Sequence, residues 1–213
     1  FCQGNVVLVS ISSGDLNGIL SRSAIATSIA NTYLSMSQST VVDVTYMRNP
    51  AQTIPFTSAL QVGTFVSNTI PPVLTAFELD LNSNVLTLVF SEPVVVSKVN
   101  LTLLTILSAP NSALFRQITG GVVQATSYSA AAVVSFTLNN ADVTFLKQQV
   151  ALATNATSTY LAAAAGMATD TGNLTNAAVS VGSPISVRLL TIDTSPPILT
   201  SFSLDMNTGQ IGL

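Results

Sequence analysis

Three Asn-X-Thr triplets are the residues of this sequence best suited to covalent chemistry. They are Asn100-Leu101-Thr102, Asn155-Ala156-Thr157 and Asn173-Leu174-Thr175. Asn-X-Ser/Thr is the acceptor pattern for N-linked glycans, which attach to the surface of secreted proteins. The triplets and the abundant Ser and Thr residues together favour a glycosylated surface. The alternative is that such triplets arise by chance in an Asn- and Thr-rich sequence.

The residues needed for catalysis are missing. The sequence has no His and no Trp, and its single cysteine, Cys2, has no imidazole to activate it. Without a base, the many Ser and Thr hydroxyls are best interpreted as strand-surface and loop residues. We therefore expect no enzyme activity and no catalytic residue. Cys2 cannot form an internal disulfide, so it either pairs with a cysteine outside this sequence or is a free thiol.

Acidic and amide side chains could hold a divalent cation. Asp80, Asn82 and Glu92 lie close together in the sequence, and Asp193 precedes a Pro-Pro pair; oxygen ligands of this kind suit calcium. Alternatively, Asp80 and Asn82 shape a turn by bonding their own backbone, which also explains why the same two residue types recur 125 residues later. We prefer the turn, and assign no metal ligand and no cofactor, with calcium as the remaining alternative.

The composition is apolar and poor in charge. Charged residues make up 7% of the chain and hydrophobic residues 48%, with a mean hydropathy of +0.57. Such a chain avoids aggregation by burying its surface in an assembly or covering it with glycans. The net charge of −3, with no run of Lys or Arg, excludes nucleic-acid binding. Every apolar run is interrupted before the ~18 residues of a membrane span, so no span is expected.

An internal repeat organises the chain. Residues 71–88 recur as residues 196–213, an offset of 125, with the same residue at nine of the eighteen positions. Residues 6–16 align with residues 133–143 at an offset of 127, and a two-residue length difference before the Pro-Pro pair reconciles the two offsets. We interpret residues 1–70 as the C-terminal part of one repeat, 71–195 as a whole repeat, and 196–213 as the opening hairpin of the next. Either the chain is a piece of a longer one, or neighbouring chains complete the broken repeats.

Hydrophobic alternation predicts an all-β fold. Apolar residues alternate with polar ones on both sides of Asn82-Ser83-Asn84, which predicts a β-hairpin over residues 77–90. Asn139 or Asn140 could cap one short helix per repeat, with Asp142 in its first turn and Val143, Leu146 and Val150 facing a core. Residues 151–170 are Ala-rich and predicted to be a loop, and residues 179–181 and 185–192 the closing strands. Many short strands and regular turns favour antiparallel β-sandwich modules, with Pro-Pro stiffening each junction.

The words Leu88-Val-Phe-Ser-Glu-Pro-Val94 and Asp193-Thr-Ser-Pro-Pro197 resemble those of tandem Ig-like repeats in large bacterial and microbial-eukaryote surface proteins. The periodicity extends the resemblance over the whole chain, although a repeat of about 125 residues is longer than a minimal Ig-like module of ~100 residues. The resemblance implies an extracellular module that spaces or assembles, as in stalks, adhesins and filament subunits.

The incomplete repeats suggest a mode of assembly. A hairpin without a module and a module without its opening strands would both expose strand edges. We expect the C-terminal hairpin of one copy to pair with the N-terminal part of the next, giving a head-to-tail filament. The residues expected at this contact are Pro197, Leu199, Phe202 and Leu204 on one side and Val7, Val9 and Ile11 on the other. The fit is imperfect, because the two parts together lack about 39 residues of a repeat.

Three functions remain open from the sequence. The first is a glycosylated, self-associating subunit of a filament or fibrous surface layer, located outside the cell. The second is the stalk of a cell-surface adhesin, which would be a long covalent array. The third, a carbohydrate-binding module, ranks below both because such modules use exposed aromatic rings, and only 6% of the residues are aromatic.

Overall fold

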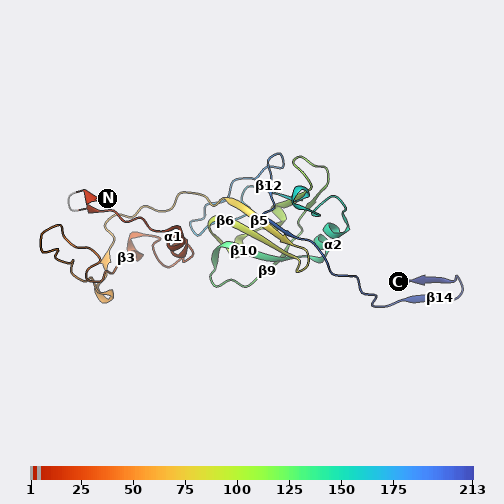
Figure 1. Cartoon of the computed structure of the whole chain (residues 1–213), viewed down its shortest axis with the longest axis horizontal. Coiled ribbons are helices and arrows are strands. Elements are labelled where there is room, and N and C mark those ends of the chain that lie inside the picture. Colours follow the sequence, from red (N-terminus) through yellow and green to blue (C-terminus); the bar gives the residue numbers. More distant parts are fainter. Residues whose placement is uncertain (1, 4–5) are drawn as a thin grey trace.

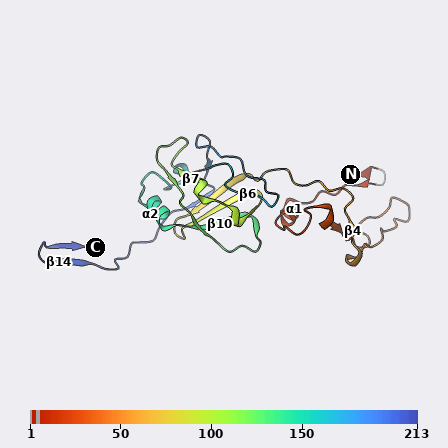
Figure 2. The ribbon, with the colours of Figure 1, turned by 180° about the vertical axis from the view of Figure 1, so that it is seen from behind.

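The computed structural model describes residues 2–3 and 6–213, and side chains from residue 6 onward, so the prediction for the Cys2 thiol lies outside the described part. The chain has a β-rich central body (residues 71–195), an N-terminal segment (residues 1–70) on one side and a C-terminal segment (residues 196–213) on the other (Figure 1). The view from behind shows the same order, with the two ends of the chain far apart (Figure 2). Among the described residues, the sheets of more than two strands all lie in the central body.

Two sheets form the central body. The five-stranded sheet has the order β13 (Leu189–Thr191), β5 (Leu74–Asp80), β6 (Val85–Val95), β10 (Ala130–Leu138) and β9 (Gly121–Val123). The four-stranded sheet has the order β12 (Ile185–Ser186), β11 (Tyr160–Ala163), β7 (Leu104–Leu107) and β8 (Phe115–Gln117). Strand is thus the main regular structure, as the sequence predicts.

The predicted hairpin is confirmed as β5 and β6. Its strands alternate buried and less buried residues, since successive side chains point to opposite faces of a sheet. The buried side chains of both sheets belong to one hydrophobic core, to which the five-stranded sheet contributes Phe77, Leu79 and Leu86 and the four-stranded sheet Leu104 and Leu161. This core is what defines the central body.

The predicted helix is α2 (Asn140–Gln148). Val143 and Leu146 are buried in the core as expected, whereas Val150 is 94% exposed because the helix ends before it. Asp142 in the first turn is fully buried. Its carboxylate accepts from Arg116 Nε at 2.8 Å, from Thr119 N at 2.8 Å and from Thr119 Oγ1 at 3.0 Å. These bonds tie α2 to β8, through Arg116, and to the chain just after it, through Thr119.

Three details of the sequence prediction were wrong. Strand β13 runs parallel to β5, where an antiparallel arrangement was expected. The reason is that the chain crosses from the four-stranded sheet after β12 and enters the other sheet beside β5 in the same direction. The Ala-rich stretch 151–170 is only partly a loop, because it contains β11, which lies between β7 and β12 and whose two alanines are buried. The closing strand predicted over residues 179–181 is not formed, because Val179 makes only an isolated bridge, to Ala163.

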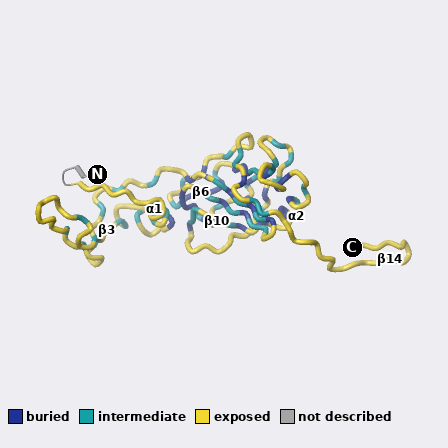
Figure 3. Tube along the Cα trace, in the orientation of Figure 1, coloured by how far each residue is buried: buried dark blue, intermediate teal, exposed yellow. Residues whose placement is uncertain are grey.

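The flanking segments contain short elements with exposed side chains. The N-terminal segment has β1 (Cys2–Gln3), β2 (Val6–Val7), α1 (Ser13–Leu20), β3 (Tyr33–Leu34) and β4 (Leu60–Gln61). The C-terminal segment has the hairpin of β14 (Ser203–Asp205) and β15 (Gln210–Gly212). Five single-turn 3-10 helices complete the described elements: η1 (Ile29–Asn31), η2 (Phe56–Ser58), η3 (Val96–Lys98), η4 (Leu101–Leu103) and η5 (Ala156–Ser158). Exposed residues dominate both segments, and most buried residues lie in the central body between them (Figure 3).

Backbone pairs of the N-terminal segment recur in the central body. Tyr33 pairs with Gln61 and Leu34 with Leu60, and their counterparts are the pairs of Tyr160 with Ser186 and Leu161 with Ile185. The isolated bridge between residues 36 and 54 recurs between 163 and 179, and that between 42 and 50 recurs between 169 and 175. The first partner is always shifted by 127 and the second by 125. The extra two residues therefore lie in the loop between Asp43 and Asn49.

Candidate assembly interface

The N-terminal segment contacts the central body at the C-terminal end of α1. Thr171 Oγ1 donates to the carbonyl oxygen of Leu20 at 3.0 Å, and the Arg22 guanidinium lies 5.6 Å from the centre of the Tyr128 ring. Further along the segment, Asn68 Nδ2 donates to Glu92 Oε2 at 2.6 Å. These polar contacts hold one segment against the other at a defined place.

Glu92 is the unusual residue of this junction. It is only 8% exposed, and its Oε1 has no hydrogen-bond partner among the described residues. Burial raises the pKa of the Glu92 carboxyl, and the negative charge of Asp170 raises it further, while the hydrogen bond from Asn68 acts in the opposite direction. A buried carboxylate without a cation is costly, and this cost shifts the protonation equilibrium of Glu92 toward the neutral acid.

The residues considered for calcium do not all come together: Asn82 bonds the residue after Asp193, whereas Glu92 lies at the other junction. Asp80 Oδ1 accepts from Asn82 N at 2.8 Å and from Ser83 N at 3.1 Å, which is the turn-shaping role preferred from the sequence. Hydrogen bonds from Ser83, followed by that from the Asn82 backbone, lower the pKa of Asp80. Glu92 instead contacts Asn68 of the N-terminal segment. The described residues include no group of three His, Cys, Asp or Glu side chains that could bind a metal ion.

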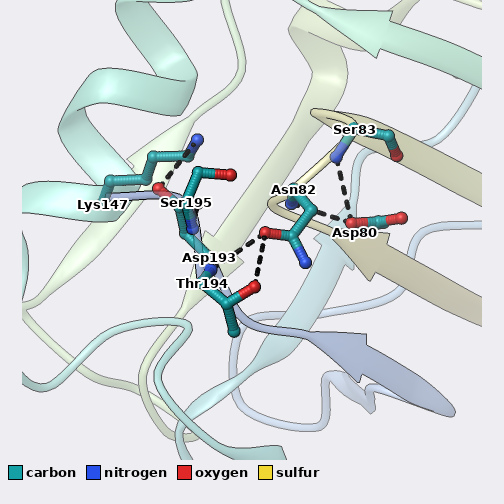
Figure 4. A network of polar contacts seen from close by, with 7 residues as sticks. All are labelled: Asp80, Asn82, Ser83, Lys147, Asp193, Thr194 and Ser195. Atoms are coloured by element: carbon teal, nitrogen blue, oxygen red, sulfur yellow. Dashed lines mark hydrogen bonds and ion pairs between the residues drawn. The ribbon is translucent and has the colours of Figure 1, made fainter. Parts of the chain in front are cut away.

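A second junction joins the central body to the C-terminal segment (Figure 4). Asn82 Oδ1 accepts from Thr194 N at 2.9 Å and from Thr194 Oγ1 at 3.4 Å. Lys147 of α2 forms an ion pair with Asp193 at 3.1 Å. The backbone N–H of Ser195, and then Lys147, lower the pKa of Asp193. The linker is therefore attached to both the β5–β6 turn and the helix, just before Pro196-Pro197.

The N-terminal residues predicted to pair between copies are exposed. Val7, Val9 and Ile11 correspond, at the offset of 127, to buried residues of β10: Val134, Phe136 and Leu138. The largest difference is at Val9, which is 80% exposed where Phe136 is 3% exposed. The same apolar pattern is thus covered in the central body and open in the N-terminal segment.

The C-terminal residues predicted for this contact are exposed as well. Pro197, Leu199, Phe202 and Leu204 correspond, at the offset of 125, to buried residues: Pro72, Leu74, Phe77 and Leu79. Phe202 is 67% exposed, whereas Phe77 is fully buried. Within one chain the two predicted sets do not meet, because they lie at opposite ends of the molecule (Figure 1).

Sequence reasoning missed two members of this surface, Ile211 and Leu213. Both are exposed, and their counterparts Leu86 and Leu88 are fully buried. The offset of 125 could have found them, because it aligns the whole hairpin and not only its first strand.

The three candidate glycosylation sites are on the surface. Asn100, Asn155 and Asn173 are all exposed. Asn100 Oδ1 and Asn155 Oδ1 each accept from the backbone N–H of the threonine two residues later, and Asn173 Oδ1 accepts from Lys98 Nζ. Each side chain is therefore placed where a bulky sugar could be accommodated.

A shallow hollow of about 350 Å³ lies on the outer face of the five-stranded sheet. Its lining includes Glu78, Thr87, Gln124 and Ser135, and none of the described residues around it is aromatic. This lining does not favour sugar binding, which relies on flat aromatic surfaces.

No family model, curated protein or solved structure matched this chain in the comparisons made. Within residues 2–3 and 6–213, no helix has the length and apolar character needed to cross a membrane. The role of the chain has to be inferred from its own residues and geometry.

Proposed function

We propose that this chain is a structural, extracellular repeat protein, the subunit of a filament or fibrous surface layer. The observation that carries the proposal is the contrast between repeated apolar positions, which are buried in the central body and exposed in both flanking segments. Exposed apolar residues that repeat a core pattern are best explained as surfaces that another strand covers. Self-association would therefore be the working activity of the protein.

The repeating unit in this proposal is a tandem Ig-like β-sandwich module, divided at residues 70/71 and 195/196. The support is the recurrence of backbone pairs at offsets of 127 and 125, together with two sheets that share one core. Each module would carry one short helix, represented by α1 and α2.

Assembly would be head-to-tail. The C-terminal hairpin and the N-terminal strand are different surfaces. When they pair between copies, an open oligomer keeps an unpaired hairpin at one end and an unpaired N-terminal strand at the other. Such a heterologous contact extends without closing unless the geometry forms a ring. Added strands gain main-chain hydrogen bonds and apolar contacts together, which suits a load-carrying fibre.

Glycans on Asn100, Asn155 and Asn173 would keep the sides of the fibre soluble. All three residues belong to the central body, are exposed, and are not part of the strands proposed to pair between copies. With 7% charged residues, the chain has few other means of staying hydrated.

The second candidate is the stalk of a cell-surface adhesin. The attached linkers favour it, since the contacts of Asn82 and Lys147 before Pro196-Pro197 would hold consecutive modules of a covalent array at a fixed angle. In a stalk the broken modules would be completed by adjoining sequence, and the chain of 213 residues would not need to self-associate.

Electron microscopy and light scattering of the purified chain distinguish the two. The filament predicts concentration-dependent oligomers with one axial repeat per copy, and Phe202→Ser should abolish them. Tyr46→Ser is the control, because Tyr46 is also an exposed aromatic residue, at 99% against 67% for Phe202, but lies outside the proposed contact. A chain that stays monomeric at high concentration would overturn the filament and favour the stalk.

A further inference from the structure

We propose a specific register for the contact between copies, in which residues 210–213 of one copy pair antiparallel with residues 7–10 of a second copy. Leu213 lies opposite Val7, Gly212 opposite Leu8, Ile211 opposite Val9 and Gln210 opposite Ser10. This inference rests on the proposed function and specifies the partner as a second copy of the same chain.

The central body provides the template. There β6 pairs antiparallel with β10, and the opposed residues are Leu88 with Val134, Thr87 with Ser135, Leu86 with Phe136, and Val85 with Thr137. Adding 125 to the first residue and subtracting 127 from the second gives the four pairs proposed above. Both offsets are those of the internal repeat.

The C-terminal hairpin already has the backbone of its counterpart. Its three opposed pairs reproduce, at an offset of 125, those of Glu78 with Thr87, Leu79 with Leu86 and Asp80 with Val85. Its turn reproduces the counterpart too: Asp205 Oδ1 accepts from Asn207 N at 2.8 Å, and Gly209 has a φ of 66° where Asn84 has 61°. The hairpin is therefore preformed for the contact.

The edges required for the contact are open in the described structure. Strand β15 pairs with β14 on one side, and its other edge corresponds to the edge with which β6 contacts β10. On the receiving side, Leu8, Val9 and Ser10 belong to no strand, and β1 covers only one edge of β2. A strand added there needs no existing pair of the central body to break.

Burial selects this register over its neighbours. In the proposed register Ile211, Leu213, Val7 and Val9 all take positions whose counterparts are buried. A slip by one residue would turn the apolar set of one strand toward the solvent-facing side of the other. The apolar face thus excludes a slip by one residue, and the β6–β10 template selects this register over slips by two.

In this proposal the occupant is a second copy of the chain. The C-terminal hairpin and residues 7–10 lie on opposite sides of the central body, so one chain cannot bring them together (Figures 1 and 3). The length of the central body between them prevents a closed monomer with this pairing.

Disulfide trapping tests the register. Cys2→Ser removes the only cysteine, and Ser10→Cys and Gln210→Cys are then placed on separate copies that differ by a mass tag. In the template, the pair that corresponds to Ser10 and Gln210 is Thr137 with Val85. Leu138 N donates to Asn84 O at 2.9 Å, so Leu138 and Asn84 form a hydrogen-bonded pair. The adjacent pair of Thr137 with Val85 is therefore a non-hydrogen-bonded one, in which the side chains come closest. Such a pair meets the distance requirement of a disulfide.

The control replaces Gln210→Cys by Ile211→Cys, which faces the other side of the strand. We expect about tenfold more mixed disulfide dimer with Gln210→Cys than with the control, since cysteines on opposite faces cannot bridge without backbone movement. If copies associate but both pairs cross-link equally, the register is wrong and the filament stands. If copies do not associate at all, the filament itself is overturned and the register with it.

Discussion

The central body and the two flanking segments have the same local structure but opposite burial. Leu34 and Leu161 occupy equivalent places in β3 and β11, with equivalent backbone partners, yet Leu34 is 60% exposed and Leu161 is fully buried. Even the positive φ values recur, 51° at Ala26 and 57° at Ala153. Local sequence is therefore sufficient for the turns and short pairs, whereas the core also requires strands that the flanking segments do not contain.

The comparison separates two kinds of stabilisation. Capping and turn hydrogen bonds act over a few residues and are present in all three parts of the chain. Burial of apolar side chains requires layers of structure from distant parts of the sequence and is concentrated in the central body. Substitutions at equivalent positions should consequently differ in effect, and their differences test this contrast.

The largest difference is expected between Phe77→Ala and Phe202→Ala. Phe77 is fully buried, so its truncation should lower the unfolding free energy of the central body by about 3–5 kcal/mol. Phe202 is exposed within a chain, so its truncation should leave thermal unfolding of the monomer unchanged while weakening association. Thermal unfolding at a concentration below association measures the first effect, and light scattering measures the second. Equal destabilisation by both variants would refute the equivalence drawn here.

Asp142→Asn and Asp15→Asn form the next pair, because both residues stand in the first turn of the repeated helix. Asp142 is fully buried and accepts from Arg116 and Thr119, so an amide would place a donor against donors and leave a cation unpaired. We expect a loss of about 2–4 kcal/mol in unfolding free energy. Asp15 accepts only from the exposed residue Ser12, and its variant should change little. Chemical denaturation of both variants provides the measurement.

As a control, Arg116→Met is added to the Asp142→Asn variant. It should recover little of the lost unfolding free energy, since the Thr119 donors would still face the amide that replaces the carboxylate. If Asp142→Asn were as well tolerated as Asp15→Asn, the buried carboxylate would not be what attaches α2 to the sheet.

A smaller effect of opposite sign is expected at Glu92, where the N-terminal segment meets the central body. Its pKa is raised in the folded protein, so the folded state binds the proton more tightly than the unfolded state does. The contribution of the Glu92 carboxyl to the unfolding free energy is fully present below the ordinary glutamate pKa of about 4.3. It is lost as the pH rises through the raised pKa of the folded protein. Glu92→Gln should therefore be more stable than the natural chain by about 1 kcal/mol near pH 7, and equally stable near pH 4.

Urea unfolding at several pH values measures this difference. Glu78→Gln is the matched control, because Glu78 pairs with Arg188 on the surface and should show no gain at neutral pH. A Glu92→Gln variant that is less stable at pH 7 would mean that the ionised carboxylate has a cation partner, which would reopen the calcium alternative.

Much of the structure could be predicted from short-range patterns. The β5–β6 hairpin followed from alternation around a turn, and α2 from its cap and the spacing of Val143 and Leu146, because these signals are local. Two features could not be predicted: the parallel pairing of β13 with β5 and the contact of Asn68 with Glu92. In both cases the local sequence does not specify the distant partner. For the candidate interface, the repeat identified the exposed strands, but only the paired register of β6 and β10 specified how they could meet.

The smallest effect is expected at the second junction. Lys147→Leu with Asp193→Asn introduces the residue types of the first junction, where Leu20 and Asn68 occupy the equivalent positions and no ion pair can form. Both side chains of the pair are partly exposed, so the melting temperature should fall by less than about 2 °C, and salt should reduce the difference. The linker should nevertheless become more mobile. Residue 193 would lose its contact with α2 and keep only its hydrogen bond from Ser195 N, while Asn82 would still accept from Thr194. Backbone NMR relaxation of residues 193–199 would detect this, and an unchanged linker would assign its attachment to Asn82 alone.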